Sequence, residues 1–126
     1  MMDLSELSAA VEKLRYQISI LAQAVDYKKN PVEALILEMD WDARDLDAVH
    51  DIFEKWDKHI RDGLEIKSGS FEADFNKIGI GYQRLKSIIL SFYRSGQWSS
   101  VCEAYVDSFG DHPSMEYHSI MKRERD

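Results

Sequence analysis

The sequence has few of the residues that interrupt or cross-link a fold: one cysteine, two prolines and six glycines among 126 residues. The lone cysteine, Cys102, cannot form an internal disulfide, which fits a reducing compartment. No apolar run approaches the roughly 18 residues that a membrane-spanning helix needs, and no signal-peptide pattern opens the chain. We therefore expect a cytoplasmic protein that does not enter a membrane.

Positive charge is also scarce, because 16 Lys and Arg stand against 23 Asp and Glu and leave a net charge of -7. Nucleic acids and anionic membranes bind through clustered Lys and Arg, so neither is an expected partner. Most of the acidic surplus lies in residues 1–63, and such a surface attracts a basic protein. The alternative is that the surplus only keeps the protein soluble.

Apolar residues at alternating three- and four-residue steps are the main positive signal. The steps are clearest in the first segment, at Leu4, Leu7, Val11, Leu14, Ile18, Leu21 and Val25. This is the a/d spacing of a heptad repeat, and it excludes a β-strand, in which side chains alternate with period two. Similar steps recur further along the chain. We expect an all-α bundle of five helices, with a sixth if the C-terminal tail adds a short one.

Capping and turn residues give the expected helix boundaries. The five helices are predicted at residues 4–26, 31–39, 43–62, 71–94 and 97–109. Gly79 and Gly81 inside the fourth indicate either that a neighbouring helix packs closely there or that the helix bends. Asp3, Asn30 and Asp42 are the expected N-caps of the first three. Residues 63–70 are expected to form a flexible loop. The helices belong to one domain, residues 1–110, followed by a polar tail at 111–126 whose charged end is expected to fray.

The first apolar stripe predicts self-association. Its flanking e and g positions are mostly small or uncharged, so another helix can approach closely: Ser8, Ala10, Gln17, Ala22 and Ala24. Seven a/d positions are also more than a short five-helix core needs. We predict a homodimer whose seam contains Leu7, Val11, Leu14, Ile18 and Leu21. The pattern leaves open whether the partner helix belongs to the same chain or to a second copy.

A second candidate surface lies at the start of the third helix. Trp41 stands beside several aspartates, and we predict a partner-binding site at Trp41, Asp42, Asp45 and Asp51. An exposed Trp anchors many protein interfaces. The alternative is that Trp41 folds back over the end of the bundle. Calcium binding is not expected, because the segment lacks the turn glycine of an EF-hand loop.

No residue set predicts catalysis, a cofactor or a metal. Asp47, His50 and Glu54 resemble half of a di-iron carboxylate site, but a second half is missing, and His59 falls on the opposite helical face. Cys102 lies among apolar residues, which is typical of a buried, inert thiol. We therefore predict no catalytic residue, no cofactor and no bound metal.

Two segments, residues 14–53 and 88–107, contain helix-cap and core residues that suggest a resemblance to a known family. The positions are Val25-Asp26, Pro31, Ala34-Leu35, Ala48-Val49, Phe92-Tyr93, Gly96, Trp98 and Val106-Asp107. In these positions the chain resembles the small all-helical family of the Bacillus protein YhaI. The resemblance implies an all-helical fold with no assigned activity, and it transfers no functional residue.

The sequence thus favours a non-catalytic, self-associating module for protein–protein interaction or regulation. One alternative is an acidic inhibitor, of the immunity type or the phage anti-defence type, that neutralises a basic enzyme. The other is a metal-dependent enzyme. An acidic concave face would favour the inhibitor, and two inward-facing carboxylate–histidine pairs would favour the enzyme.

Overall fold

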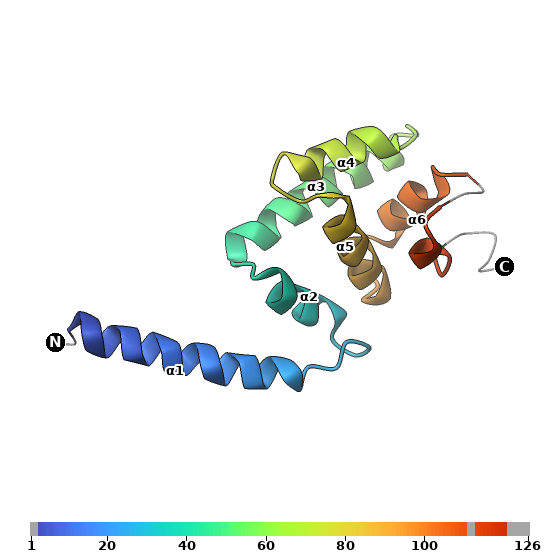
Figure 1. The fold of residues 1–126 in the computed structure, drawn as a ribbon. Helices are drawn as coiled ribbons and strands as arrows, with labels where there is room; N and C mark the ends of the chain where they lie inside the picture. The colour runs from blue at the N-terminus through green and yellow to red at the C-terminus, as the bar shows by residue number, and fades with distance from the viewer. Residues whose placement is uncertain (1–2, 111–112, 121–126) are drawn as a thin grey trace.

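The computed structural model describes residues 3–110 and 113–120, and every regular element in these ranges is helical (Figure 1). The elements are α1 (Leu4–Gln23), α2 (Pro31–Met39), α3 (Ala43–Arg61), α4 (Ser68–Asn76), α5 (Tyr82–Arg94), α6 (Ser99–Asp107) and the 3₁₀ turn η1 (Met115–Tyr117). The expected all-α fold is confirmed. The bounds of α2 match the prediction, whereas α1 ends three residues earlier than expected.

All three expected residues stand at the N-cap positions, and two of them make the side-chain capping bond. The Asp3 side chain accepts a hydrogen bond from the Glu6 amide at 2.7 Å. Asp42 and Asp45 cap each other reciprocally, because each side chain accepts from the other residue's backbone amide at 2.9 Å. Asn30 precedes α2 as expected and Pro31 is the first helical residue, but in the described structure the Asn30 side chain makes no capping hydrogen bond.

The helix predicted over residues 71–94 is two helices, and that prediction is wrong. Gly79 takes a φ of 81°, a left-handed conformation that favours glycine, and the Ile80 amide bonds back to the Phe75 carbonyl at 3.0 Å. The break lets α5 take a different direction from α4, so that apolar residues of both helices reach one core. A straight helix over residues 71–94 would be about 36 Å long, and about half of its apolar residues would extend beyond the core. The loop at 63–70 is also shorter than predicted, because α4 already begins at Ser68.

The core lies among α2 to α6 and centres on Phe53 of α3. The rings of Phe71, Phe75, Phe92 and Trp98 all lie within 6.0 Å of the Phe53 ring. The core extends past the predicted boundary at residue 110, because Tyr117 and Ile120 are fully buried in it. The expected fraying of the charged end at 122–126 lies outside the described residues.

Helix α1 stands apart from this core. Figure 1 shows it running from the free N-terminal end to a point beneath α2, and no residue of the described Leu4–Gln23 helix is buried. In its last turn, Ala22 lines a shallow groove together with Ala34 and Leu37 of α2. Among the residues that the structure describes, no helix is long and apolar enough to cross a membrane. Residues 31–120 are called the body below.

Candidate functional site

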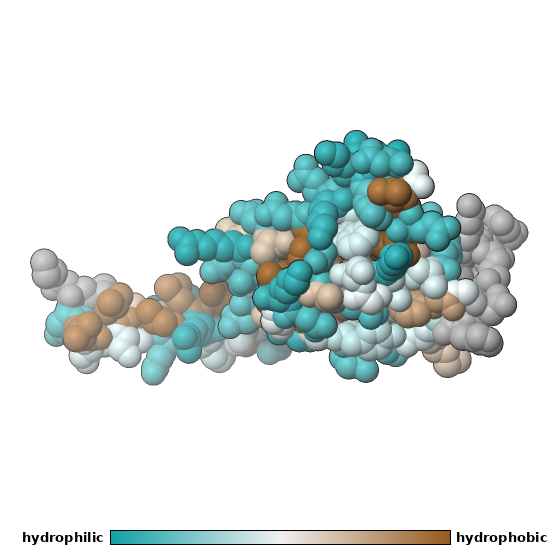
Figure 2. Space-filling view, turned by 90° about the horizontal axis from the view of Figure 1, so that it is seen from above, coloured by the Kyte–Doolittle hydropathy of each residue, from teal (hydrophilic) through white to brown (hydrophobic). Residues whose placement is uncertain are grey.

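Six large apolar side chains lie along one face of α1 and are 42% to 84% exposed. They are called the α1 stripe: Leu4, Leu7, Val11, Leu14, Ile18 and Leu21. Figure 2 shows brown, hydrophobic side chains along the part of this helix that projects from the body. All five predicted seam residues belong to the α1 stripe. The seventh a/d position, Val25, follows the end of α1 and is half-buried.

The α1 stripe is large for a monomer. With their exposed fractions, the six residues present on the order of 600 Å² per copy, at the upper end of the about 300–600 Å² of the largest apolar patch on a typical monomer. The spacing makes the patch continuous, since successive a and d positions lie within about 60° of each other around the helix. Scattered exposed leucines need no explanation, but a continuous row of this size indicates a binding surface.

The edges of the α1 stripe carry little charge. Of the e and g positions along α1, Arg15 is the only charged one between the N-cap and the last turn. A shallow groove on this helix is lined by the apolar Leu4, Leu7 and Val11, by Ser8, and by one residue of each charge, Glu12 and Arg15. A second helix can therefore approach the α1 stripe without burying an opposing row of charges.

The predicted partner site at the start of α3 is only partly assembled. Asp42 and Asp45 lie together, but each already uses a carboxylate oxygen in the capping box. Asp51 is six residues further along α3, about 240° around the helix from Asp45, so it faces elsewhere. Trp41 is half-buried and packs against the core, as in the alternative in which it folds back over the bundle end. All three aspartates remain exposed.

The histidines of α3 serve packing in this structure. The Nδ1 atom of His50 accepts a hydrogen bond from the Trp98 indole at 2.9 Å, and its ring lies edge-on to Phe92 at 5.4 Å. The Nε2 atom of His59 lies 3.0 Å from the Glu65 carbonyl oxygen. Within residues 3–110 and 113–120, no group of three or more His, Cys, Asp or Glu side chains is arranged to hold a metal ion.

Cys102 is buried, as its apolar neighbours predict. It is fully inaccessible to solvent, and its thiol lies 3.7 Å from the Ile89 carbonyl oxygen. Burial, with a smaller effect of the Glu103 charge, raises the pKa of the Cys102 thiol to about 12. The thiol therefore stays protonated near neutral pH, whereas a reactive cysteine needs the thiolate.

A groove between α2 and α5 is too small for a typical ligand. Its volume is about 180 Å³, and Glu38 and Arg94 lie among its lining residues. Pockets that hold drug-sized ligands enclose about 300–1,000 Å³. The groove therefore gives no candidate site for a small molecule of that size.

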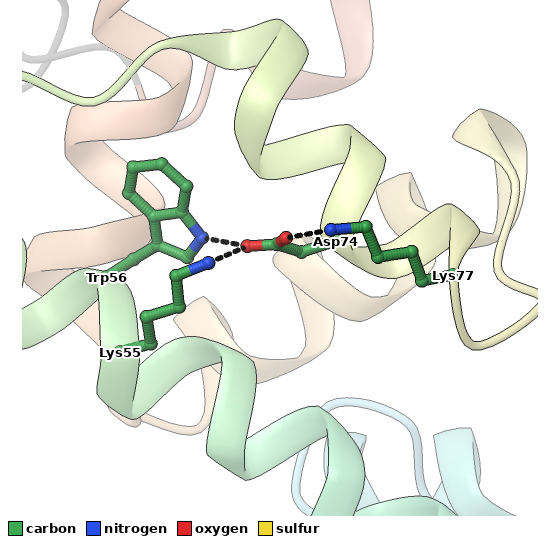
Figure 3. A network of polar contacts seen from close by, with 4 residues as sticks. All are labelled: Lys55, Trp56, Asp74 and Lys77. Carbon is green, nitrogen blue, oxygen red and sulfur yellow. Dashed lines mark hydrogen bonds and ion pairs between the residues drawn. The ribbon is translucent and has the colours of Figure 1, made fainter.

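One polar cluster was not predicted, and Figure 3 shows it. A carboxylate oxygen of Asp74 in α4 accepts hydrogen bonds from the Lys55 ammonium and the Trp56 indole of α3, both at 2.8 Å. Lys77 lies 3.6 Å from the other oxygen. Burial by itself raises the pKa of Asp74, but these bonds and the charges of Lys55 and Lys77 outweigh it and hold the pKa below its usual value. The cluster ties α3 to α4.

The chain was compared with protein-family models, with curated proteins and with solved structures, and none of the three comparisons gave a match.

Proposed function

We propose that this protein is a non-catalytic helical interaction module that works as a homodimer, joined through the α1 stripes of two copies. The observation that carries the proposal is the exposure of six apolar side chains on a helix that buries none of its residues against its own described chain. Helices in proteins gain most of their stability by packing an amphipathic face, and α1 lacks that packing within one copy. A partner helix would supply it.

The area of the α1 stripe supports a second copy as the partner. Two stripes together present roughly 1,200 Å² of mainly apolar surface, at the lower end of the range of about 1,200–2,000 Å² that specific protein interfaces bury. The nearly uncharged edges support self-pairing as well. Helices that select a different partner use opposite charges at e and g, whereas an identical helix meets no row of like charges here.

The exposed aspartates at the start of α3 support a second candidate, an acidic inhibitor of a basic enzyme. The support is electrostatic only, because Trp41 packs against the core and is not a free anchor. Exposed charges mainly raise the rate of association and add little affinity. The homodimer therefore remains the first proposal.

Paired variants of α1 test the homodimer by light scattering at tens of micromolar. Leu14→Glu places a charge in the middle of the α1 stripe, and the variant should have the mass of one chain, 14.7 kDa. Tyr16→Glu is the matched control, since Tyr16 is 67% exposed but lies outside the α1 stripe. The control should keep the dimer mass. Equal masses for the two variants would contradict the role of the α1 stripe.

A further inference from the structure

We infer that the two α1 helices of the proposed dimer pair in parallel and in register, with both N-termini at the same end. This inference rests on the proposed homodimer and adds the arrangement of the two copies. Its evidence is the type of residue at each position of the α1 stripe. The a positions are Leu4, Val11 and Ile18, and the d positions are Leu7, Leu14 and Leu21.

In a parallel pair of helices, the a positions and the d positions favour different side chains. There each a residue meets the same a residue of the other helix, and each d residue meets its own d counterpart. Parallel two-stranded coils favour β-branched residues at a and leucine at d. Val11 and Ile18 at a, with three leucines at d, follow this preference, and Leu4 at a is the one departure from it. In an antiparallel pair, each a residue meets a d residue. The separation of β-branched residues at a from leucines at d would then have no role in packing.

The position of the body permits this arrangement. Ala22, the residue of α1 that faces α2, is an e position, beside the α1 stripe and not on it. In a parallel pair with twofold symmetry, the e edges of the two helices lie on opposite sides of the coil. The two bodies therefore leave the coil on opposite sides, although they share its C-terminal end.

Edge charges neither favour nor oppose the parallel arrangement strongly. In register, Arg15 at e lies across from Ala10 at g of the second copy, so its alkyl stem can cover the seam. The acids Asp3 and Glu6 of both copies gather at one end, but they are exposed. Exposed charges contribute little compared with the packing of six apolar layers.

Disulfide trapping tests the orientation. Leu4 and Leu21 lie about 26 Å apart along α1, whereas a disulfide needs α-carbons within about 7 Å. In a parallel dimer, Leu4→Cys alone and Leu21→Cys alone each give a covalent dimer on mild oxidation. In an antiparallel dimer, neither variant does so alone, and a mixture of the two gives the mixed disulfide. The unmodified chain is the control, because its only cysteine, Cys102, is buried.

Spin labels outside the seam give a second measurement if the cysteine variants weaken the dimer. Ser5→Cys and Ser19→Cys are exposed and lie off the α1 stripe. The inference predicts a shorter distance between two labels at the same position than between one at 5 and one at 19. The reverse order, or only the mixed disulfide, overturns the parallel arrangement but leaves the homodimer standing. A monomeric unmodified chain in light scattering overturns both.

Discussion

The indole nitrogen of Trp98 donates a hydrogen bond to Nδ1 of His50 across 2.9 Å, and this bond joins the start of α6 to the middle of α3. Trp98 holds a left-handed backbone conformation with a φ of 54°, which is uncommon for a bulky residue. Its ring also stacks on Phe53 at 5.9 Å. Because the indole can only donate, Nδ1 of His50 must accept and carries no proton. The residue that resembled a metal ligand in the sequence positions a helix.

Replacing His50 should show how much the Trp98–His50 hydrogen bond contributes to the free energy of unfolding. His50→Leu leaves the half-buried indole N–H without its acceptor, and we expect a loss of about 1–2 kcal/mol in the free energy of unfolding. His50→Asn keeps an acceptor at the δ position and should lose less, although Leu is the better helix former. Urea unfolding of both variants measures the difference. A Leu variant as stable as the Asn variant would show that the bond contributes nothing.

Acid should weaken the cluster around Asp74. A carboxyl whose pKa is lower in the folded chain binds fewer protons there, so its stabilisation is complete above the unfolded value, near 3.8. The stabilisation is lost as the pH falls through the lower folded value. Asp74→Ala should lower the free energy of unfolding by about 2 kcal/mol at pH 7 and by clearly less at acid pH. Asp51→Ala, at an exposed position, is the control.

That comparison is made by urea unfolding of the unmodified chain and both variants at a series of pH values from 7 downward. The difference between the unmodified chain and Asp74→Ala should shrink as the pH passes below 3.8. A difference that stays constant with pH would mean that the Asp74 charge does not stabilise the fold.

The aspartates at the start of α3 should differ in how much stability is lost when each is replaced by alanine. Asp42 and Asp45 form the capping box, so Asp42→Ala and Asp45→Ala should each lower stability by about 1 kcal/mol. Asp51→Ala should stay within about 0.5 kcal/mol of the unmodified chain. Thermal unfolding followed by circular dichroism measures all three. If Asp51→Ala is as destabilising as Asp42→Ala, the capping box does not account for the difference.

Removal of residues 1–23 should leave the body folded. No residue of α1 is buried in the described structure, so the truncated chain should unfold cooperatively with a free energy within about 0.5 kcal/mol of the Leu14→Glu variant. That variant is the right reference, because a dimer would add a concentration-dependent term to the stability. Urea titration followed by Trp fluorescence reports on the body. A truncated chain that no longer folds would show that α1 belongs to the core.

The sequence could predict those features of the fold that depend on near neighbours. Pro31 and the Asp42–Asp45 pair give helix starts, and the heptad steps give the helical state of residues 4–23. The apolar steps continue across Gly79, so they do not show that the chain turns there and starts a second helix. The sequence does not predict the burial of Tyr117, because its partners in the core, such as Tyr105, are brought near only by folding.

The sequence predicts which residues form the α1 stripe, but it does not predict what packs against them. The heptad pattern identifies the α1 stripe, but a pattern within one helix does not say whether a partner helix lies in the same chain. The Asp74 cluster was missed for a related reason, since Asp74 and Lys55 are 19 residues apart in the sequence and meet only through the packing of α3 on α4.

The mass of the unmodified chain in solution tests the central claim most directly. Sedimentation equilibrium at tens of micromolar should give about twice 14.7 kDa, with dissociation on dilution if the association is weak. Two copies of this chain, joined through the α1 stripe, account for that mass. A mass of 14.7 kDa throughout this concentration range would contradict the homodimer and leave the α1 stripe without the partner proposed for it.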